Sequence, residues 1–143
     1  MKNFQLHNVG EFNDLNQYVF APEGSSIKID GKLFLGDLLS LSSMEISLNK
    51  NAPGTGMNFK HRHKEHEEVY IFINGEGEML IDDEIVKVKE GSIISMKPQA
   101  NRTWWNTGST DLTYIVLQAP EGGMKSPGIN DGELLEGKVP WID

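Results

Sequence analysis

The stretch HRHKEHEEVYIFINGEG, residues 61–77, is the most informative part of this chain. It opens with two histidines two positions apart and continues into an apolar segment of period two. Residues two apart on an extended chain point to the same side, so His61 and His63 would present two imidazoles in parallel. Glu68 begins the next extended segment and adds a carboxylate. Imidazole and carboxylate groups both bind divalent transition metals, so these three residues are candidate metal ligands.

Apolar and polar residues alternate through most of the chain, and no segment keeps the spacing of an amphipathic helix over several turns. This pattern predicts an all-β domain. Strands are expected over residues 44–48, 57–63, 68–73, 78–81, 85–88, 92–96, 103–106 and 113–118. Asp30-Gly31, between IKI and KLF, predicts a tight hairpin, because this dipeptide tolerates the positive φ of a type I′ turn. Residues 14–20 fit either a strand or a short helical turn.

Short strands at this spacing are typical of a β-sandwich or a β-barrel. The opening stretch also resembles the first motif of the cupin superfamily, which is written G-x5-H-x-H-x3 or x4-E-x6-G. His61, His63, Glu68 and Gly75 match its spacing, and only the leading glycine is displaced. The chain is therefore similar to a cupin in the part that carries the candidate ligands.

A later segment resembles the second cupin motif, G-x5-P-x-G-x2-H-x3-N. Gly91 and Asn106 match the two ends of this motif, whereas Lys97 and Gln99 stand at its usual proline and glycine. Arg102 stands where the family usually places its last metal-binding histidine. The second motif therefore supports the fold and removes one expected metal ligand.

The resemblance implies a cupin (jelly-roll) β-barrel built from two antiparallel sheets. The barrel core would cover residues 40–119. Residues 1–39 would form strands and loops that pack on the barrel or on a partner subunit, and residues 120–143 would form an irregular extension rich in Gly and Pro. Small cupins also imply a homodimer, and Trp141 gives the extension an apolar group that could dock on either subunit.

Arginine cannot coordinate a cation, because its guanidinium carries only donors and stays protonated. Two arrangements are therefore open. In one, His61, His63 and Glu68 bind Fe, Mn, Ni or Zn as three protein ligands, and Arg102 turns aside or holds a substrate anion. In the other, Arg102 pairs with Glu68 in place of the cation, and the pocket holds no metal.

Aromatic residues expected on the inner faces of the strands suggest a pocket wall. Taken singly, each is more readily explained as core packing. Together they would suit a small ligand with an apolar or sugar-like body and an anionic end. The residues assigned to ligand binding are Arg102, Phe59, Tyr70, Phe72, Trp104 and Tyr114.

The cupin resemblance leaves three functions open. One is a metal-dependent enzyme, dioxygenase- or isomerase-like, acting on a small organic acid or sugar derivative. A second is a non-catalytic binding or sensing module that uses the same pocket without metal. A third is proton transfer by a histidine, as the resemblance to cupin-type sugar epimerases implies. The sequence does not choose between enzyme and binding module, and it assigns no catalytic residue.

Composition limits the partners. Of 143 residues, 21 are acidic and 13 are basic, and the net charge of −8 comes without the basic stripe that nucleic acid requires. The chain has no cysteine, so neither disulfides nor thiolate chemistry are expected. Its first residues, MKNFQLHNVGEF, lack the apolar segment of a signal peptide, and no run reaches the length of a membrane span. We expect a cytoplasmic protein that binds a small molecule and neither nucleic acid nor membrane.

Overall fold

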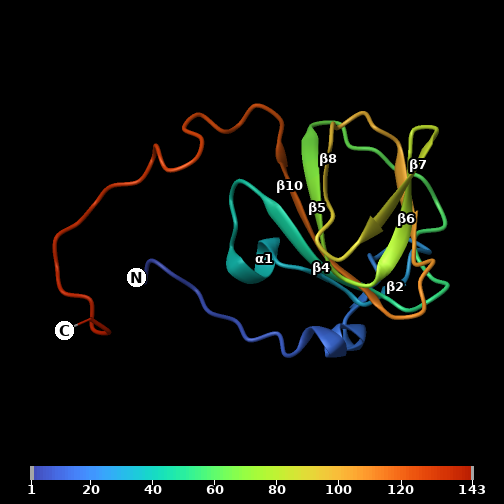
Figure 1. The fold of residues 1–143 in the computed structure, drawn as a ribbon, viewed down its shortest axis with the longest axis horizontal. Coiled ribbons are helices and arrows are strands. Elements are labelled where there is room, and N and C mark those ends of the chain that lie inside the picture. Colours follow the sequence, from blue (N-terminus) through green and yellow to red (C-terminus); the bar gives the residue numbers. More distant parts are fainter. Residues whose placement is uncertain (1, 143) are drawn as a thin grey trace.

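A computed structural model describes residues 2–142 and confirms the all-β fold. Two antiparallel sheets enclose the core, and the short helical elements lie beside them (Figure 1). No described helix is long and apolar enough to cross a membrane. In chain order the elements are η1 (Phe12–Gln17), β1 (Val19–Phe20), β2 (Ile29–Asp30), β3 (Lys32–Phe34), α1 (Gly36–Leu39), β4 (Glu45–Asn51), β5 (His66–Asn74), β6 (Glu76–Ile81), β7 (Glu84–Lys89), β8 (Ile93–Met96), β9 (Arg102–Trp105) and β10 (Leu112–Pro120).

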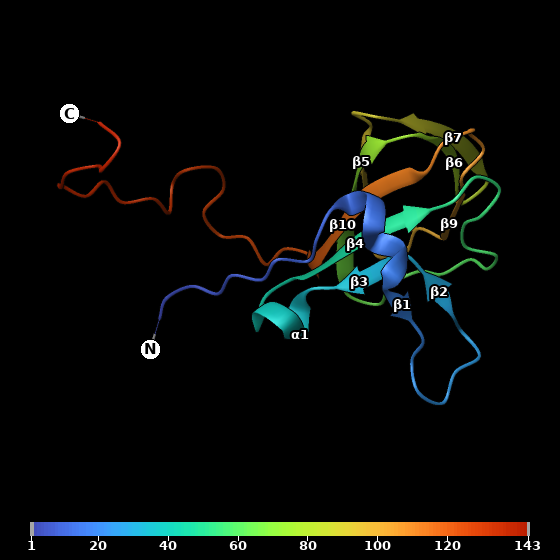
Figure 2. The same ribbon diagram turned by 90° about the horizontal axis from the view of Figure 1, so that it is seen from below.

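The larger sheet has five strands in the order β3-β4-β10-β5-β8, and the smaller sheet has three in the order β7-β6-β9. β1 and β2 form a separate two-stranded ribbon. Figure 2 shows β4 and β10 side by side, with β6 and β7 of the smaller sheet across the barrel from them. This arrangement of two facing antiparallel sheets is the one expected from the sequence.

The core lies between the two sheets and follows the alternation of β5. Glu68, Tyr70 and Phe72 are each at most 3% exposed, whereas Val69 and Ile71 between them are only partly buried. Successive strand residues face opposite sides, so the first group points into the barrel and the second points outward. The apolar run of the opening stretch therefore supplies both an inner and an outer face.

The inner face of β4 is polar. Ser47, Asn49 and Asn51 are buried there, because their side chains have partners inside the barrel. The Oδ1 atom of Asn51 accepts hydrogen bonds from the Tyr114 hydroxyl at 2.8 Å and from Trp104 Nε1 at 3.2 Å. Buried polar atoms of this kind are tolerated when they are hydrogen-bonded.

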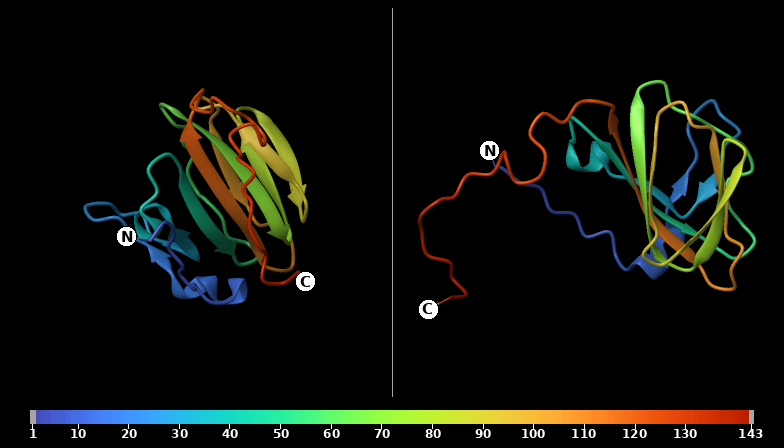
Figure 3. Two further views of the ribbon diagram at one scale, coloured as in Figure 1. Left: turned by 90° about the vertical axis from the view of Figure 1, so that its left-hand side faces the viewer. Right: turned by 45° about the horizontal axis from the view of Figure 1, so that its top comes forward.

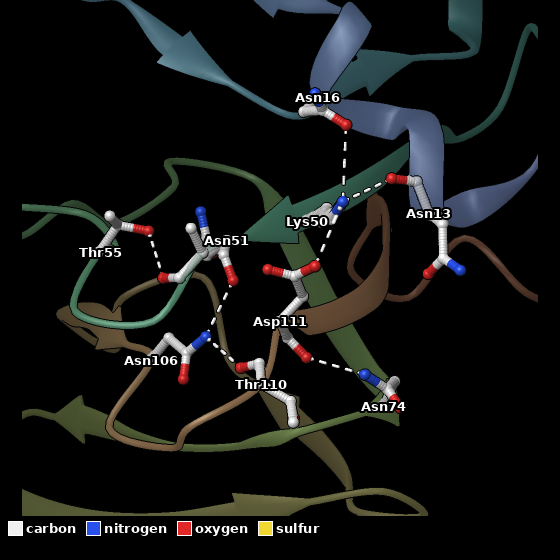
Figure 4. Close-up of polar contacts among 10 residues, drawn as sticks. Asn13, Asn16, Lys50, Asn51, Thr55, Asn74, Asn106, Thr110 and Asp111 are labelled. Atoms are coloured by element: carbon white, nitrogen blue, oxygen red, sulfur yellow. Dashed lines mark hydrogen bonds and ion pairs between the residues drawn. The ribbon is translucent and has the colours of Figure 1, made fainter.

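Figure 4 shows how the loops at one end of the barrel are fastened. The Lys50 ammonium lies 3.2 Å from Oδ2 of Asp111 and 3.5 Å from Oδ1 of Asn16, so it ties β4 both to the start of β10 and to η1. Asn106 is fully buried, and its Nδ2 donates to the backbone oxygen of Asn51 at 2.9 Å. The asparagine that ends the second motif is thus a structural anchor.

The strand expected over residues 57–63 is wrong. The segment is irregular and meets the rest of the barrel only at isolated points, which include a β-bridge to Arg102 and a hydrogen bond to the Pro98 carbonyl. A strict alternation of side chains does not hold between such points. Phe59 is consequently 39% exposed and does not belong to the inner wall predicted for it.

The hairpin expected at Asp30-Gly31 is also wrong. β2 pairs with β1 and β3 pairs with β4, so the chain changes sheets at this dipeptide. Gly31 has φ +74°, and a Cβ atom there would lie 2.3 Å from the carbonyl oxygen of Lys50. Glycine is required at this position by the close approach of two backbones as well as by the turn.

The two ends of the chain differ in how they pack. Residues 12–17 adopt the helical turn, one of the two alternatives open for this region, and Leu15 anchors it with 1% of its surface exposed. Residues 121–142 contain no strand or helix. Figures 1 and 2 show this extension and the N-terminal residues leaving the barrel on the same side.

Candidate metal centre

The three predicted ligands meet inside the barrel. One potential ligand atom from each of His61, His63 and Glu68 lies within 4.8 Å of the other two. Glu68 is 3% exposed, and the two histidines are partly buried. The spacing of the first motif therefore brings together the side chains that it was expected to bring together.

Backbone hydrogen bonds place the two histidines, although their segment is not a strand. His61 and Arg102 exchange two of them. The His61 nitrogen lies 3.0 Å from the Arg102 carbonyl oxygen, and the Arg102 nitrogen lies 2.9 Å from the His61 carbonyl oxygen. The His63 amide donates to the carbonyl of Pro98 at 2.9 Å. The rings of His61 and His63 then lie edge to face with centroids 5.4 Å apart.

The buried atoms of the cluster lack hydrogen-bond partners within the described chain. This holds for Nδ1 of His61, Nε2 of His63, Oε1 of Glu68 and Nε of Arg102. Nε2 of His63 and Oε1 of Glu68 are 3.1 Å apart, and they form an ion pair only when the imidazole is protonated. Unsatisfied polar atoms are costly inside a protein, and four in one place indicate a missing partner.

The side chain of Arg102 is fully buried, and its fork points to a loop. Nη2 donates to the carbonyl of Lys97 at 3.1 Å, and Nη1 lies 3.5 Å from the carbonyl of Pro98. Only Nε faces Glu68, with 3.5 Å between Nε and Oε1. A guanidinium that replaced a metal ion would be expected to bond the carboxylate directly, at about 2.7–2.9 Å.

Both histidines are held in the neutral form. The pKa of His61 is lowered to about 4, chiefly by burial and in addition by the nearby charges of Arg102, His63 and Lys32. Burial also lowers the pKa of His63, with Glu68 opposing and Arg102 adding to the effect. Metals bind the neutral imidazole, so neither histidine needs to lose a proton first. The donor set of two imidazoles and one carboxylate, all unsatisfied, fits a divalent transition metal.

Comparison with known proteins agrees with this geometry. A family model for the cupin domain matches residues 50–118. The crystal structure of a cupin protein from Bacteroides fragilis is 25% identical and superposes with a TM-score of 0.79, covering 95% of this chain and 100% of that one. The chain belongs to the cupin superfamily. No curated protein sequence matches this cupin.

Two further solved structures share the fold with this cupin. A predicted oxalate decarboxylase from Thermotoga maritima is 20% identical, with a TM-score of 0.59, and the match covers 72% of this chain and 90% of that one. A putative sugar phosphate isomerase from Acidithiobacillus ferrooxidans is 22% identical, with a TM-score of 0.55, over 62% of this chain and 57% of that one. At these identities the likeness concerns the fold of the barrel.

The aromatic residues of this cupin pack tightly around the cluster. Tyr70, Phe72, Trp104 and Tyr114 are each at most 4% exposed. The ring of Tyr70 lies 5.4 Å from that of Trp104 and 5.9 Å from that of Tyr114, and His61 lies 5.9 Å from Trp104. These contacts make the four residues part of the core. Trp104 also borders His61, one of the candidate metal ligands.

Lys32 is a site residue that the sequence did not indicate. Its Nζ donates to Oδ1 of Asn49 at 2.8 Å and to Oγ of Ser47 at 3.3 Å on the inner face of β4. Burial lowers the pKa of Lys32 to about 8, although the charges of Glu68 and Glu45 oppose this shift. Period two places Lys32 and Phe34 on one face of a short strand, but it cannot tell that this face is the inner one. A second interior cation therefore accompanies Arg102.

Proposed function

We propose that this cupin binds one divalent transition metal, Fe, Mn, Ni or Zn, through His61, His63 and Glu68, and acts on a small organic acid or sugar derivative. The observation that carries the proposal is that these three residues place one potential ligand atom each within 4.8 Å of the other two. In the described chain each of them also has a buried side-chain nitrogen or oxygen atom without a hydrogen-bond partner. The low pKa of the histidines supports it, because both imidazoles are ready to coordinate.

A divalent metal at this position would act as a Lewis acid that polarises an oxygen atom of the substrate. The chain's own residues would supply the charge and the packing around the substrate. Arg102 places a positive charge beside Glu68 without bonding its Oε1 atom, and the buried ring of Trp104 packs against His61. Lys32 adds a second positive charge near the cluster, which favours an anionic substrate.

The related structures support the same class of substrate. One is named for oxalate and another for a sugar phosphate, both small anions. From these names we carry over only the chemical class, a small molecule with at least one anionic group. The reaction would be dioxygenase- or isomerase-like, in line with the open coordination positions that three protein ligands leave.

The metal-free binding module stays as a second proposal because of one contact. Nε of Arg102 lies 3.5 Å from Oε1 of Glu68, so a small shift of either side chain would join them as an ion pair. In that case Arg102 would take the place of the cation, and the pocket would bind a ligand without catalysing a reaction.

Metal content decides between the two. The purified protein is stripped with chelator, reloaded separately with Fe(II), Mn, Ni and Zn, and measured by elemental analysis. We expect one metal per chain in the wild type and a loss of binding of about tenfold or more in His61→Ala and Glu68→Gln. His66→Ala is the matched control, because His66 bonds to Gln118 and lies outside the triad. A wild type that takes up none of the four metals would contradict the metal proposal and favour the binding module.

We further propose that the protein is a homodimer. The apolar side chains exposed at both chain ends support this proposal. The cytoplasmic location stays a prediction from the sequence.

A further inference from the structure

Two adjoining cavities lie between residues 26–30, which contain β2, and residues 52–59, which follow β4. Their volumes are about 500 Å³ and about 360 Å³, and four lining residues are common to both, namely Lys28, Ile29, Thr55 and Gly56. Figure 3 shows, on its right, the blue ribbon of β1 and β2 beside the green segment that follows β4. We call the two cavities together the outer groove. Either volume lies in the range of roughly 300–1000 Å³ that small-molecule sites have.

The larger cavity of the outer groove is remote from the candidate metal centre. Asn51, at the end of β4, and Asp111, just before β10, are among its lining residues. Asn51 pairs with Leu112, whereas Glu68 of the metal centre pairs with Gln118 near the other end of β10. The two pairings are about six residues apart, or roughly 20 Å along the strand. None of the three candidate metal ligands lines either cavity, so a ligand in the outer groove would bind independently of the metal.

Asn51 gives the larger cavity a hydrogen-bond donor that is held in place. Asn51 is 7% exposed, and its Oδ1 atom accepts hydrogen bonds from the Tyr114 hydroxyl and from Trp104 Nε1. These two bonds fix the orientation of the amide. The Nδ2 group has no hydrogen-bond partner among residues 2–142, so both of its donors are left for a ligand.

The charges that line the larger cavity cancel. Lys28 and Lys50 bring two ammonium groups, and Asp30 and Asp111 bring two carboxylates. Lys50 and Asp111 already form an ion pair, whereas Lys28 and Asp30 are exposed. A lining without net charge favours a neutral ligand over an anion. Carboxylates accept hydrogen bonds, and amide and ammonium groups donate them, so a matching ligand has groups that do both, as hydroxyls do.

The smaller cavity adds two aromatic side chains that stay in contact with solvent. Trp105 is 40% exposed and Phe59 is 39% exposed. Gly56 lines both cavities, and a Cβ atom there would lie 2.9 Å from Cε3 of Trp105. Glycine therefore leaves the passage beside the Trp105 ring open. An exposed aromatic ring next to such polar groups suits a sugar, because the C–H groups of a sugar stack on the ring while its hydroxyls bond to the polar residues.

We propose that the outer groove is a second ligand site and that it binds a neutral saccharide. One sugar ring stacks on Trp105, and hydroxyl groups of the same ring or the next one bond to Asn51 and Asp30. This site goes beyond the proposed function and does not use the metal. It also accounts for the exposure of Phe59, which borders the same groove.

Saccharide binding is tested on the full-length protein by saturation-transfer NMR and by titration. The probes are glucose, galactose, mannose, maltose, cellobiose and lactose, each up to about 10 mM. At least one is expected to bind, and Trp105→Leu and Asp30→Asn are each expected to weaken its binding by about tenfold. Trp141→Leu and Asp131→Asn are the matched controls, because both residues are exposed in the C-terminal extension and line neither cavity. Circular dichroism confirms that each variant is folded.

Failure of all six saccharides to bind would overturn the proposal, as would binding that a folded Trp105→Leu protein retains in full. Chelator treatment and His61→Ala distinguish the outer groove from the metal centre, and neither is expected to change the affinity for the saccharide. A loss of saccharide binding in either case would place the sugar at the metal centre, which contradicts the outer groove and leaves the proposed metal site intact. A protein that takes up no metal and still binds the saccharide would contradict the metal proposal alone.

Discussion

The Nε atom of Arg102 lies 3.5 Å from Oε1 of Glu68, and the two groups do not form a hydrogen bond. The guanidinium instead donates to the carbonyl of Lys97. Arg102 thus lowers the cost of burying the carboxylate through its charge and leaves the carboxylate oxygen free. Arg102 therefore stabilises the negative charge of Glu68 without supplying a hydrogen-bond partner for its Oε1 atom.

Arg102→His is expected to raise the affinity for Zn or Ni by about tenfold or more, because it removes a repelling cation and adds an imidazole beside Glu68. Isothermal titration of the chelator-treated protein measures the change. Arg102→Gln is the control, since it removes the charge and adds no imidazole. An Arg102→His protein that binds metal no better than Arg102→Gln would show that position 102 does not face the metal.

Acid is expected to destabilise the protein through His61. Its pKa is about 4 in the folded chain and near its ordinary value of 6.5 in the unfolded chain, so the unfolded chain binds more protons between these two values. The stability associated with the neutral imidazole is therefore lost as the pH falls from about 6.5 to about 4. Thermal melts of chelator-treated wild type and His61→Gln should show a smaller decline in the variant over this window. Parallel declines would count against a neutral, buried His61.

Lys32→Met is expected to raise the free energy of unfolding at pH 7 by about 1–2 kcal/mol, because a buried ammonium is replaced by an apolar chain and only part of the gain is offset by lost hydrogen bonds. The pKa of Lys32 is lowered to about 8, so the penalty of its charge is full below that pH and disappears towards 10.5. The advantage of Lys32→Met should shrink over the same range. Urea unfolding at pH 7 and pH 10 measures it, with the exposed Lys87→Met as control. A destabilised Lys32→Met at pH 7 would contradict the expectation.

Gly31→Ala is expected to lower the free energy of unfolding by about 2–4 kcal/mol, since the new Cβ atom would lie 2.3 Å from the carbonyl oxygen of Lys50. Gly24→Ala is the control, because it has the backbone strain of a positive φ without the clash. Gly24 has a similar φ of +75° and nothing within 4 Å of the added atom, so its cost should be only about 1 kcal/mol. Equal losses in chemical denaturation would show that the close approach at Gly31 is unimportant.

The sequence predicted those features that depend on local spacing. Glu68, Tyr70 and Phe72 lie on one face because β5 is a regular strand, and His61 and His63 meet Glu68 because the first motif encodes their separation. Phe59 was misplaced because its segment has no continuous ladder to enforce alternation.

Other features depend on information that a short stretch of sequence does not contain. Period two groups Lys32 with Phe34, yet only the packing of β3 on β4 places both on the polar inner face. Asp30-Gly31 has the composition of a hairpin turn, whereas the flanking strands pair with β1 and with β4 and not with each other. The prediction of a positive φ at Gly31 was correct. Which strands pair with each other was decided by contacts outside this dipeptide.

The pair of backbone hydrogen bonds that joins His61 to Arg102 involves no side-chain atom. The backbone of the first histidine is therefore held without help from the Arg102 side chain. Histidine in place of Arg102 would keep these two backbone hydrogen bonds and give up the bonds of the guanidinium to the carbonyls of Lys97 and Pro98. One substitution therefore changes the number of candidate ligands while the backbone that holds the first of them stays the same.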